Sequence, residues 1–92
     1  MPNTDTSILV VDDTKFSSAM VNRVIARAGY LDVRHANTAA NALKLLEERP
    51  AHILIADWLM PEMDGLELTQ HVRQLDEAGN HFTYVMLLTA KE

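Results

Sequence analysis

The 92-residue sequence contains no cysteine, only three glycines and three prolines, and few aromatic side chains, at 5%. Without cysteine the chain has no disulfide framework, no thiolate zinc site and no cysteine nucleophile. The low glycine and proline content excludes collagen-like and low-complexity chains, and a hydrophobic fraction of 48% excludes a disordered tail. These absences leave a small folded domain.

Basic residues are also scarce, because eight Lys and Arg stand against thirteen Asp and Glu, for a net charge of −5. A domain with this charge repels phosphate backbones, so we expect no direct binding to nucleic acid. The first apolar run, Ile8 to Val11, is too short for a signal peptide or a membrane span. A chain of this length supports one hydrophobic core, and we expect residues 1–92 to form a single domain in the cytoplasm.

Apolar residues follow two alternating patterns along the chain. Short runs rich in β-branched residues predict four strands, at residues 7–11, 31–36, 52–56 and 82–88. Helical spacing predicts three helices between them, namely 14–28, a second between Thr38 and Pro50, and a third from Gly65 through Leu75. Strands that alternate with helices indicate right-handed βαβ units, that is, an α/β fold with a parallel sheet and helices on both faces.

Polar residues with functional potential follow three of these strands. Asp12 and Asp13 come after the first strand, Asp57 after the third and Thr89 after the fourth. The carboxyl ends of parallel strands meet at one edge of the sheet, where open α/β folds bind their ligands. If the first, third and fourth strands are neighbours, these groups are about 5 Å apart for each strand crossed.

Three carboxylates at one edge repel one another, and a divalent cation relieves that repulsion. An oxygen-rich site without cysteine favours Mg²⁺, Mn²⁺ or Ca²⁺ over zinc or copper. A carboxylate beside Mg²⁺ can attack phosphorus and form an aspartyl phosphate, and the Thr89 hydroxyl can hydrogen-bond a phosphoryl oxygen. Taken singly, each residue also has a plainer interpretation as a helix N-cap, a turn residue or a surface hydroxyl.

Three segments together resemble the receiver domain of bacterial two-component response regulators, the chemotaxis response regulators among them. The segments are Val11-Asp12-Asp13, the string Asp-Trp-Leu-Met-Pro-Glu-Met-Asp-Gly at 57–65, and Leu88-Thr89-Ala90. The resemblance spans about residues 7–91 and implies a flavodoxin-like, doubly wound parallel sheet. It implies that this chain holds four strands in the order 2-1-3-4 with three helices, and that it is an incomplete receiver lacking the fourth helix, fifth strand and fifth helix.

The same resemblance implies a role for each residue of the acidic edge. Asp57 is the expected phosphoacceptor and also belongs to the expected metal site, with Asp13 as the direct Mg²⁺ ligand and Asp12 as a carboxylate that acts largely through bound water. The backbone carbonyl of Leu59 completes the expected metal site, with Mn²⁺ as an alternative ion, and Thr89 is the expected switch hydroxyl. The implied partners are a histidine kinase or a histidine phosphotransfer protein and an output domain or downstream protein of undefined kind, without a membrane.

Three functions fit the sequence. The first is a phosphoacceptor switch, and the second is a Mg²⁺-dependent phosphohydrolase, which needs an acid two residues after its nucleophile. Leu59 occupies that position, so we expect no turnover enzyme. The third is an interaction module that works without phosphorylation. Because residues 84–88 of the expected fourth strand are apolar and lie at an uncovered edge, we also expect the chain to self-associate.

Overall fold

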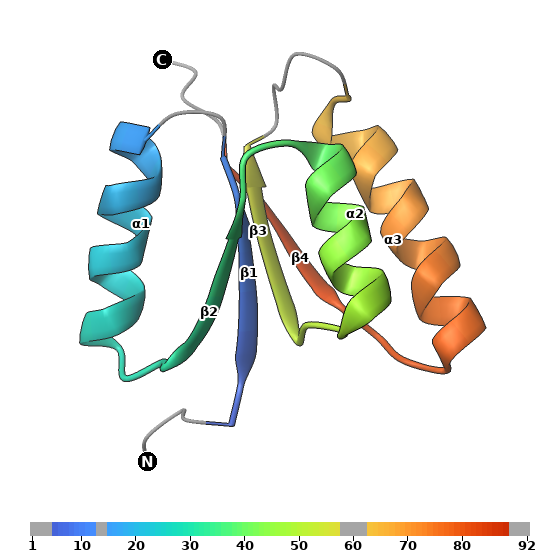
Figure 1. The fold of residues 1–92 in the computed structure, drawn as a ribbon, viewed down its shortest axis with the longest axis horizontal. Helices are drawn as coiled ribbons and strands as arrows, with labels where there is room; N and C mark the ends of the chain where they lie inside the picture. The colour runs from blue at the N-terminus through green and yellow to red at the C-terminus, as the bar shows by residue number, and fades with distance from the viewer. Residues whose placement is uncertain (1–4, 13–14, 58–62, 89–92) are drawn as a thin grey trace.

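The computed structural model describes residues 5–12, 15–57 and 63–88, which form a parallel sheet with helices on both faces (Figure 1). The elements in chain order are β1 (Ser7–Val11), α1 (Lys15–Arg27), β2 (Asp32–Ala36), α2 (Ala39–Glu48), β3 (Ile53–Asp57), α3 (Gly65–Gly79) and β4 (Tyr84–Leu88). This order confirms the alternation of strands and helices predicted from the sequence, with boundaries close to the predicted ones.

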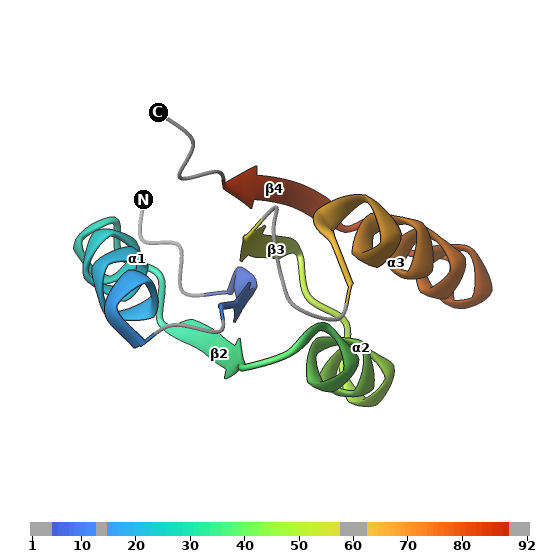
Figure 2. The ribbon, with the colours of Figure 1, turned by 90° about the horizontal axis from the view of Figure 1, so that it is seen from above.

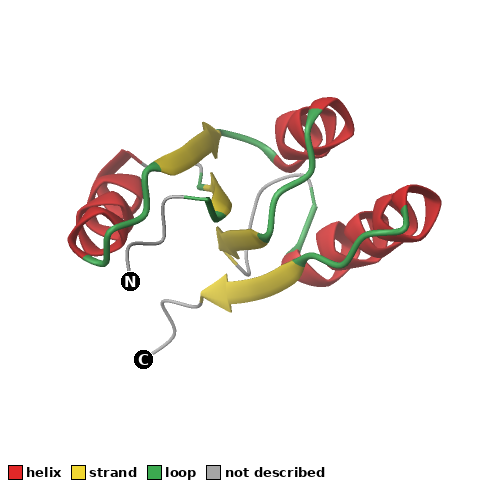
Figure 3. Cartoon of the chain, turned by 90° about the horizontal axis from the view of Figure 1, so that it is seen from below, coloured by secondary structure: helices red, strands yellow, loops and turns green. Residues whose placement is uncertain are grey.

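The strands lie in the order β2-β1-β3-β4, and every neighbouring pair is parallel. α1 covers one face of the sheet, and α2 and α3 cover the other, as seen from above in Figure 2 and from below in Figure 3. From β1 the chain passes first to β2 on one side and later to β3 on the other. The fold is therefore the expected doubly wound arrangement, with its topological switch point between β1 and β3.

Two apolar clusters form the core, one on each face of the sheet. Because successive side chains of a strand point to opposite faces, β1 and β3 contribute to both clusters. The larger cluster lies against α2 and α3 and includes Leu9, Val11, Ala42, Leu46, Leu54, Leu68 and Val72. The smaller one, on the α1 side, consists of Ile8, Val10, Ile25 and Ile55.

The helix ends follow local sequence signals. The Thr38 hydroxyl oxygen accepts a hydrogen bond from the backbone N–H of Asn41 at 3.1 Å, and so caps α2. The Asp64 carboxylate accepts one from the backbone N–H of Glu67 at 2.9 Å, and so caps α3. Gly29 follows α1 with a φ of 93°, a conformation that favours glycine. These caps fix where α2 and α3 begin relative to the ends of β2 and β3.

Two acidic residues at the amino end of the sheet are held by arginines. The Asp32 carboxylate accepts hydrogen bonds from both terminal nitrogens of Arg49, at 2.7 and 2.9 Å. The buried Asp76 carboxylate accepts from the Arg73 guanidinium at 2.7 Å. It also accepts from the backbone N–H and the hydroxyl of Thr83, at 2.9 and 2.7 Å. These contacts tie β2 to the end of α2, and α3 to the start of β4.

Candidate functional site

The carboxyl edge of the sheet brings together two of the predicted acidic residues. Val11 of β1 and Ala56 of β3 are register partners, so the residues that follow them, Asp12 and Asp57, lie at the same level on neighbouring strands. Neighbouring strands are about 4.8 Å apart, which places the two residues next to each other. This edge adjoins the switch point between β1 and β3.

Asp12 is buried, and its backbone is fixed by the sheet. Its N–H donates a hydrogen bond to the carbonyl of Ala36 at 3.1 Å, which extends the pairing of β1 with β2 by one residue. The main chain at Asp12 is therefore held by β2 while the residue stands beside β3. A carboxylate positioned by a rigid backbone is suited to a site whose geometry must be preserved.

Asp57 is the last residue of β3 and is half-buried. Its register partner on β4 is Leu88, the residue immediately before Thr89 in the sequence. The predicted site residues Asp13, Leu59 and Thr89 themselves lie outside the described residues, and their roles stay predictions.

The described acids have the donor atoms of a hard-cation site. Within residues 5–12, 15–57 and 63–88, no three acidic or histidine side chains gather closely enough to hold a metal ion. Asp12 and Asp57 supply carboxylate oxygens, which are the ligands that Mg²⁺ prefers, and Mg²⁺ keeps several waters when few protein ligands are present. The predicted remaining ligands, Asp13 and the Leu59 carbonyl, are one and two residues along the chain from this pair. The donor set fits Mg²⁺ or Mn²⁺.

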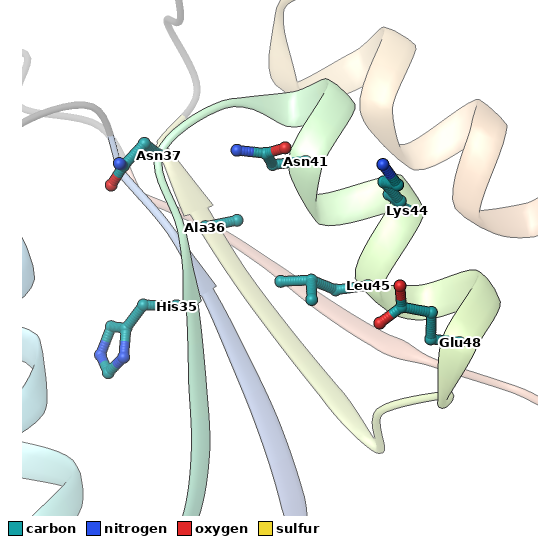
Figure 4. A pocket seen from close by; sticks show the side chains of 7 residues that line it. All are labelled: His35, Ala36, Asn37, Asn41, Lys44, Leu45 and Glu48. Atoms are coloured by element: carbon teal, nitrogen blue, oxygen red, sulfur yellow. The ribbon is translucent and has the colours of Figure 1, made fainter.

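A separate hollow lies between β2 and α2, near the same end of the sheet (Figure 4). Its volume is about 300 Å³, and it is lined by His35, Ala36, Asn37, Asn41, Lys44, Leu45 and Glu48. Asn41, Lys44 and Glu48 follow one side of α2 at helical spacing. Their mixture of amide, ammonium and carboxylate groups is typical of the solvated flank of a helix, and sequence analysis did not single them out as a site.

No helix in the parts of the chain that the structure describes is long and apolar enough to cross a membrane.

Comparison with known proteins relates most of the chain to one family. A family model of the response regulator receiver domain matches residues 8–92. The chain is similar to the chemotaxis protein CheY1 of Helicobacter pylori, with 35% identity over 83 residues, which cover 89% of this chain and 66% of that protein. It is also similar to the CheY homolog of Campylobacter jejuni, with 40% identity over 67 residues, covering 72% of this chain and 52% of that protein. The chain thus spans less than two thirds of the length of these relatives.

Solved structures show the same fold. The receiver domain of the histidine kinase CKI1 from Arabidopsis thaliana, complexed with Mg²⁺ and BeF3⁻, has a TM-score of 0.86 and 24% sequence identity. The match covers 98% of this chain and 69% of that one. The chemotaxis protein CheY4 of Vibrio cholerae has a TM-score of 0.81 and 30% identity, with coverage of 95% and 70%.

Proposed function

Because this chain belongs to the response regulator receiver family, we propose that it accepts a phosphoryl group on Asp57 as part of a cytoplasmic two-component phosphorelay. The observation that carries the proposal is the placement of Asp12 and Asp57 side by side at the carboxyl edge. This is the edge at which a doubly wound sheet binds ligands, next to its switch point. Conversion of Asp57 to an acyl phosphate there changes the charge at one end of the sheet.

The proposed phosphoryl donor is a phosphohistidine on a histidine kinase or a histidine phosphotransfer protein. One oxygen of the Asp57 carboxylate forms the new O–P bond while the N–P bond of the phosphohistidine breaks and its electron pair returns to the imidazole. Asp13 and the Leu59 carbonyl are the proposed direct ligands of Mg²⁺, with Asp12 acting largely through bound water and Mn²⁺ as a substitute. The bound ion supplies charge neutralisation for the phosphoryl oxygens, and the CKI1 receiver complexed with Mg²⁺ and BeF3⁻ supports this choice of ion.

Thr89 is the proposed relay from the phosphoryl group to the rest of the molecule. In the sequence it directly follows Leu88, the β4 residue that pairs with Asp57. A hydrogen bond from this hydroxyl to a phosphoryl oxygen would draw the carboxyl end of β4 toward Asp57. An output domain or a downstream protein is the proposed reader of that change.

The residues favour acceptance of a phosphoryl group over its repeated hydrolysis. Leu59, two residues after Asp57, has no group that can act as a general acid or base. We therefore propose that the chain is not a turnover enzyme. A second candidate function, a module that binds partners or itself without phosphorylation, is favoured by the exposed apolar side chains of β4.

The test is to incubate the chain with Mg²⁺ and acetyl phosphate and to measure its intact mass. We expect a single phosphoryl adduct that disappears when Mg²⁺ is chelated and in the variant Asp57→Ala. The matched control is Asp64→Asn. Asp64 follows Asp57 in the sequence and caps α3, and we expect this variant still to be labelled.

The other outcomes separate the alternatives. An adduct that persists in Asp57→Ala contradicts the assignment of the acceptor. A wild-type chain that acquires no adduct favours the interaction module, and steady release of phosphate from a simple phosphoester favours a hydrolase.

A further inference from the structure

The amino end of the sheet carries two histidines in front of neighbouring strands. His52 directly precedes β3, and His81 stands three residues before β4. The centroids of their rings are 6.3 Å apart, and the ring planes are inclined at 61°. Histidine is the side chain that gains a proton between about pH 8 and pH 5. Each ring also contacts the backbone of another residue, so a change in its protonation can affect the sheet directly.

The His52 ring contacts the first residue of β1. Its Nδ1 accepts a hydrogen bond from the backbone N–H of Ser7 at 2.9 Å. Because a backbone N–H can only donate, Nδ1 carries no proton in this contact, and the neutral ring carries its proton on Nε2. The backbone N–H of His52 in turn donates to the Ser7 carbonyl at 2.9 Å. Both backbone groups of Ser7 are therefore bonded to this one histidine.

The two residues of this contact differ in their exposure. His52 is exposed, so a proton reaches its ring from solvent without any unfolding of the chain. Ser7 is only 3% exposed, so its backbone N–H has little access to water while the ring is in place. A buried donor that loses its acceptor costs free energy, because water does not replace the lost bond. The contact thus joins an exposed group that responds to pH with a buried group that depends on it.

The charged groups around Ser7 are engaged with one another. The Ser7 hydroxyl oxygen accepts hydrogen bonds from Arg34 of β2 at 3.3 Å and from Arg49, at the end of α2, at 3.5 Å. Asp32 of β2 is bonded to Arg49 at 2.7 Å, and Glu48 of α2 attracts Arg34. The acids on this side are therefore directed to arginines. A protonated histidine ring gains no ion pair with them that would compensate for a lost backbone bond.

His81 makes the opposite kind of contact. Its Nε2 lies 2.8 Å from the carbonyl oxygen of Ala51, which can only accept, so Nε2 carries a proton and donates. Protonation of the other ring nitrogen leaves this bond intact. On α3, Asp76 accepts the backbone N–H of His81 at its carbonyl, while its carboxylate is bonded to Arg73. Of the two histidines, only His52 loses a backbone contact when its ring is protonated.

We propose that His52 is a pH-sensitive contact that secures the start of β1. The neutral ring accepts the Ser7 N–H and holds the amino end of β1 against the start of β3. A proton on Nδ1 turns this acceptor into a donor, so the bond to the Ser7 N–H breaks and the ring moves away. The proposal concerns the end of the sheet opposite the candidate site and does not rest on phosphorylation of Asp57.

Amide hydrogen exchange of the folded chain tests the contact directly. The quantity measured is the protection factor of the Ser7 amide, corrected for intrinsic exchange, at about pH 7.5 and about pH 5. We expect it to fall about tenfold at the lower pH, as the loss of one buried hydrogen bond implies. The amide of Leu9, a fully buried residue at the centre of β1, is the internal reference. Unchanged protection of Ser7, or an equal fall at Leu9, overturns the proposal.

Two substitutions at the same position separate the acceptor from its charge. His52→Asn places an amide oxygen at about the position of Nδ1, where it accepts the Ser7 N–H and gains no proton. We expect this variant to keep the protection of Ser7 at both pH values. His52→Ala has no acceptor, and we expect it to show the lower protection at both. Circular dichroism establishes that each variant is folded. A His52→Asn chain that responds to pH as the wild type does contradicts the assignment.

Other histidines of the chain are the matched controls. His81→Gln keeps an N–H donor toward Ala51 but does not titrate, and His71→Gln changes an exposed residue of α3. We expect both variants to retain the wild-type response of the Ser7 amide. Loss of the response in His81→Gln would identify the neighbouring ring as the sensor in place of His52. Its loss in His71→Gln would indicate a general effect of net charge, and either result overturns the proposal.

Discussion

The two ends of the sheet use aspartate in different ways. At the amino end, Asp32 and Asp76 are each held by an arginine, and Asp76 also accepts two hydrogen bonds from Thr83. At the carboxyl end, Asp12 and Asp57 each follow a residue of the register pair Val11 and Ala56, on neighbouring strands. The same type of residue, aspartate, therefore stabilises the fold at one end of the sheet and forms the candidate site at the other.

This difference shows that the position of an acid relative to the strand ends is more informative than its burial. Asp12 and Asp76 are both buried. Asp76 lies beside a cation and two donors that complete its hydrogen bonding, which makes it a structural residue. Asp12 lies at the edge where doubly wound parallel sheets bind their ligands, and the proposed acceptor follows the neighbouring position on β3. Substitutions at each end, measured for both phosphorylation and stability, test this division.

The largest expected effect is the loss of phosphorylation in Asp57→Asn. The amide is not a nucleophile toward phosphorus, so we expect no adduct after treatment with Mg²⁺ and acetyl phosphate. The free energy of unfolding should change by less than about 1 kcal/mol, because the substitution keeps the shape of a half-buried side chain. Intact mass and urea denaturation measure the two quantities. A loss of several kcal/mol would show that Asp57 also holds the fold.

The next effect, at the opposite end, is on stability alone. Asp76→Ala leaves the N–H and hydroxyl of Thr83 without their acceptor and deprives Arg73 of its ion pair. We expect a cost of about 2–4 kcal/mol in the free energy of unfolding, measured by urea denaturation. Asp64→Ala is the control, because it removes the exposed cap of α3 and should cost about 1 kcal/mol.

The folded fraction of Asp76→Ala should still be labelled on Asp57. A variant that stays folded but loses labelling would contradict the division between the two ends.

A third, smaller effect concerns the affinity for Mg²⁺. If Asp12 acts through bound water, Asp12→Asn should weaken Mg²⁺ binding by about 10–100-fold, the range found for residues that orient metal ligands. The Mg²⁺ concentration needed for half-maximal labelling measures this change. Asp32→Asn, a substitution of the same kind at the amino end, should leave that concentration unchanged, and an equal shift in both variants would indicate a general effect of charge.

Most of the fold was predictable because local signals and the global pattern agree. The run at β1 was predicted as a strand, and all five of its residues are buried. Thr38 and Asp64 are favourable N-cap residues, and both act as caps. Several strand boundaries moved by one or two residues; for example, β3 runs from Ile53 to Asp57, and β4 begins two residues after the predicted Phe82. Strand ends depend on hydrogen bonds to neighbouring strands, which a single sequence does not display.

The convergence of Asp12 and Asp57 was also predictable, because it requires only that the first and third strands be parallel neighbours. The role of Asp76 was not. In the sequence it stands three residues after Arg73 near the end of an amphipathic helix, a spacing typical of an exposed ion pair. Its burial comes from Thr83, which approaches only when the chain turns back into β4. Such contacts depend on tertiary structure, and no local pattern specifies them.

The smallest expected effect is a difference between Asp32 and Asp76 in how each affects the pH dependence of the free energy of unfolding. The hydrogen bonds from Arg49 hold the pKa of Asp32 below its ordinary value of 3.8. Because the folded pKa is lower than the unfolded one, this ion pair contributes stability that is fully present above about pH 4 and is lost as the pH falls through the folded value. Both side chains are partly exposed, so solvent and salt screen the pair and the contribution is small.

Asp32→Asn should accordingly flatten the acid side of the stability curve slightly, while 1 M NaCl should bring wild type and variant closer together. Urea denaturation between pH 2.5 and pH 6 measures both changes. Asp76→Asn, which alters a buried carboxylate with three hydrogen bonds, should lower stability at pH 6 and respond little to salt. If instead the Asp32 variant proves the more destabilised of the two at pH 6, the exposed pair and not the buried one secures the amino end of the sheet.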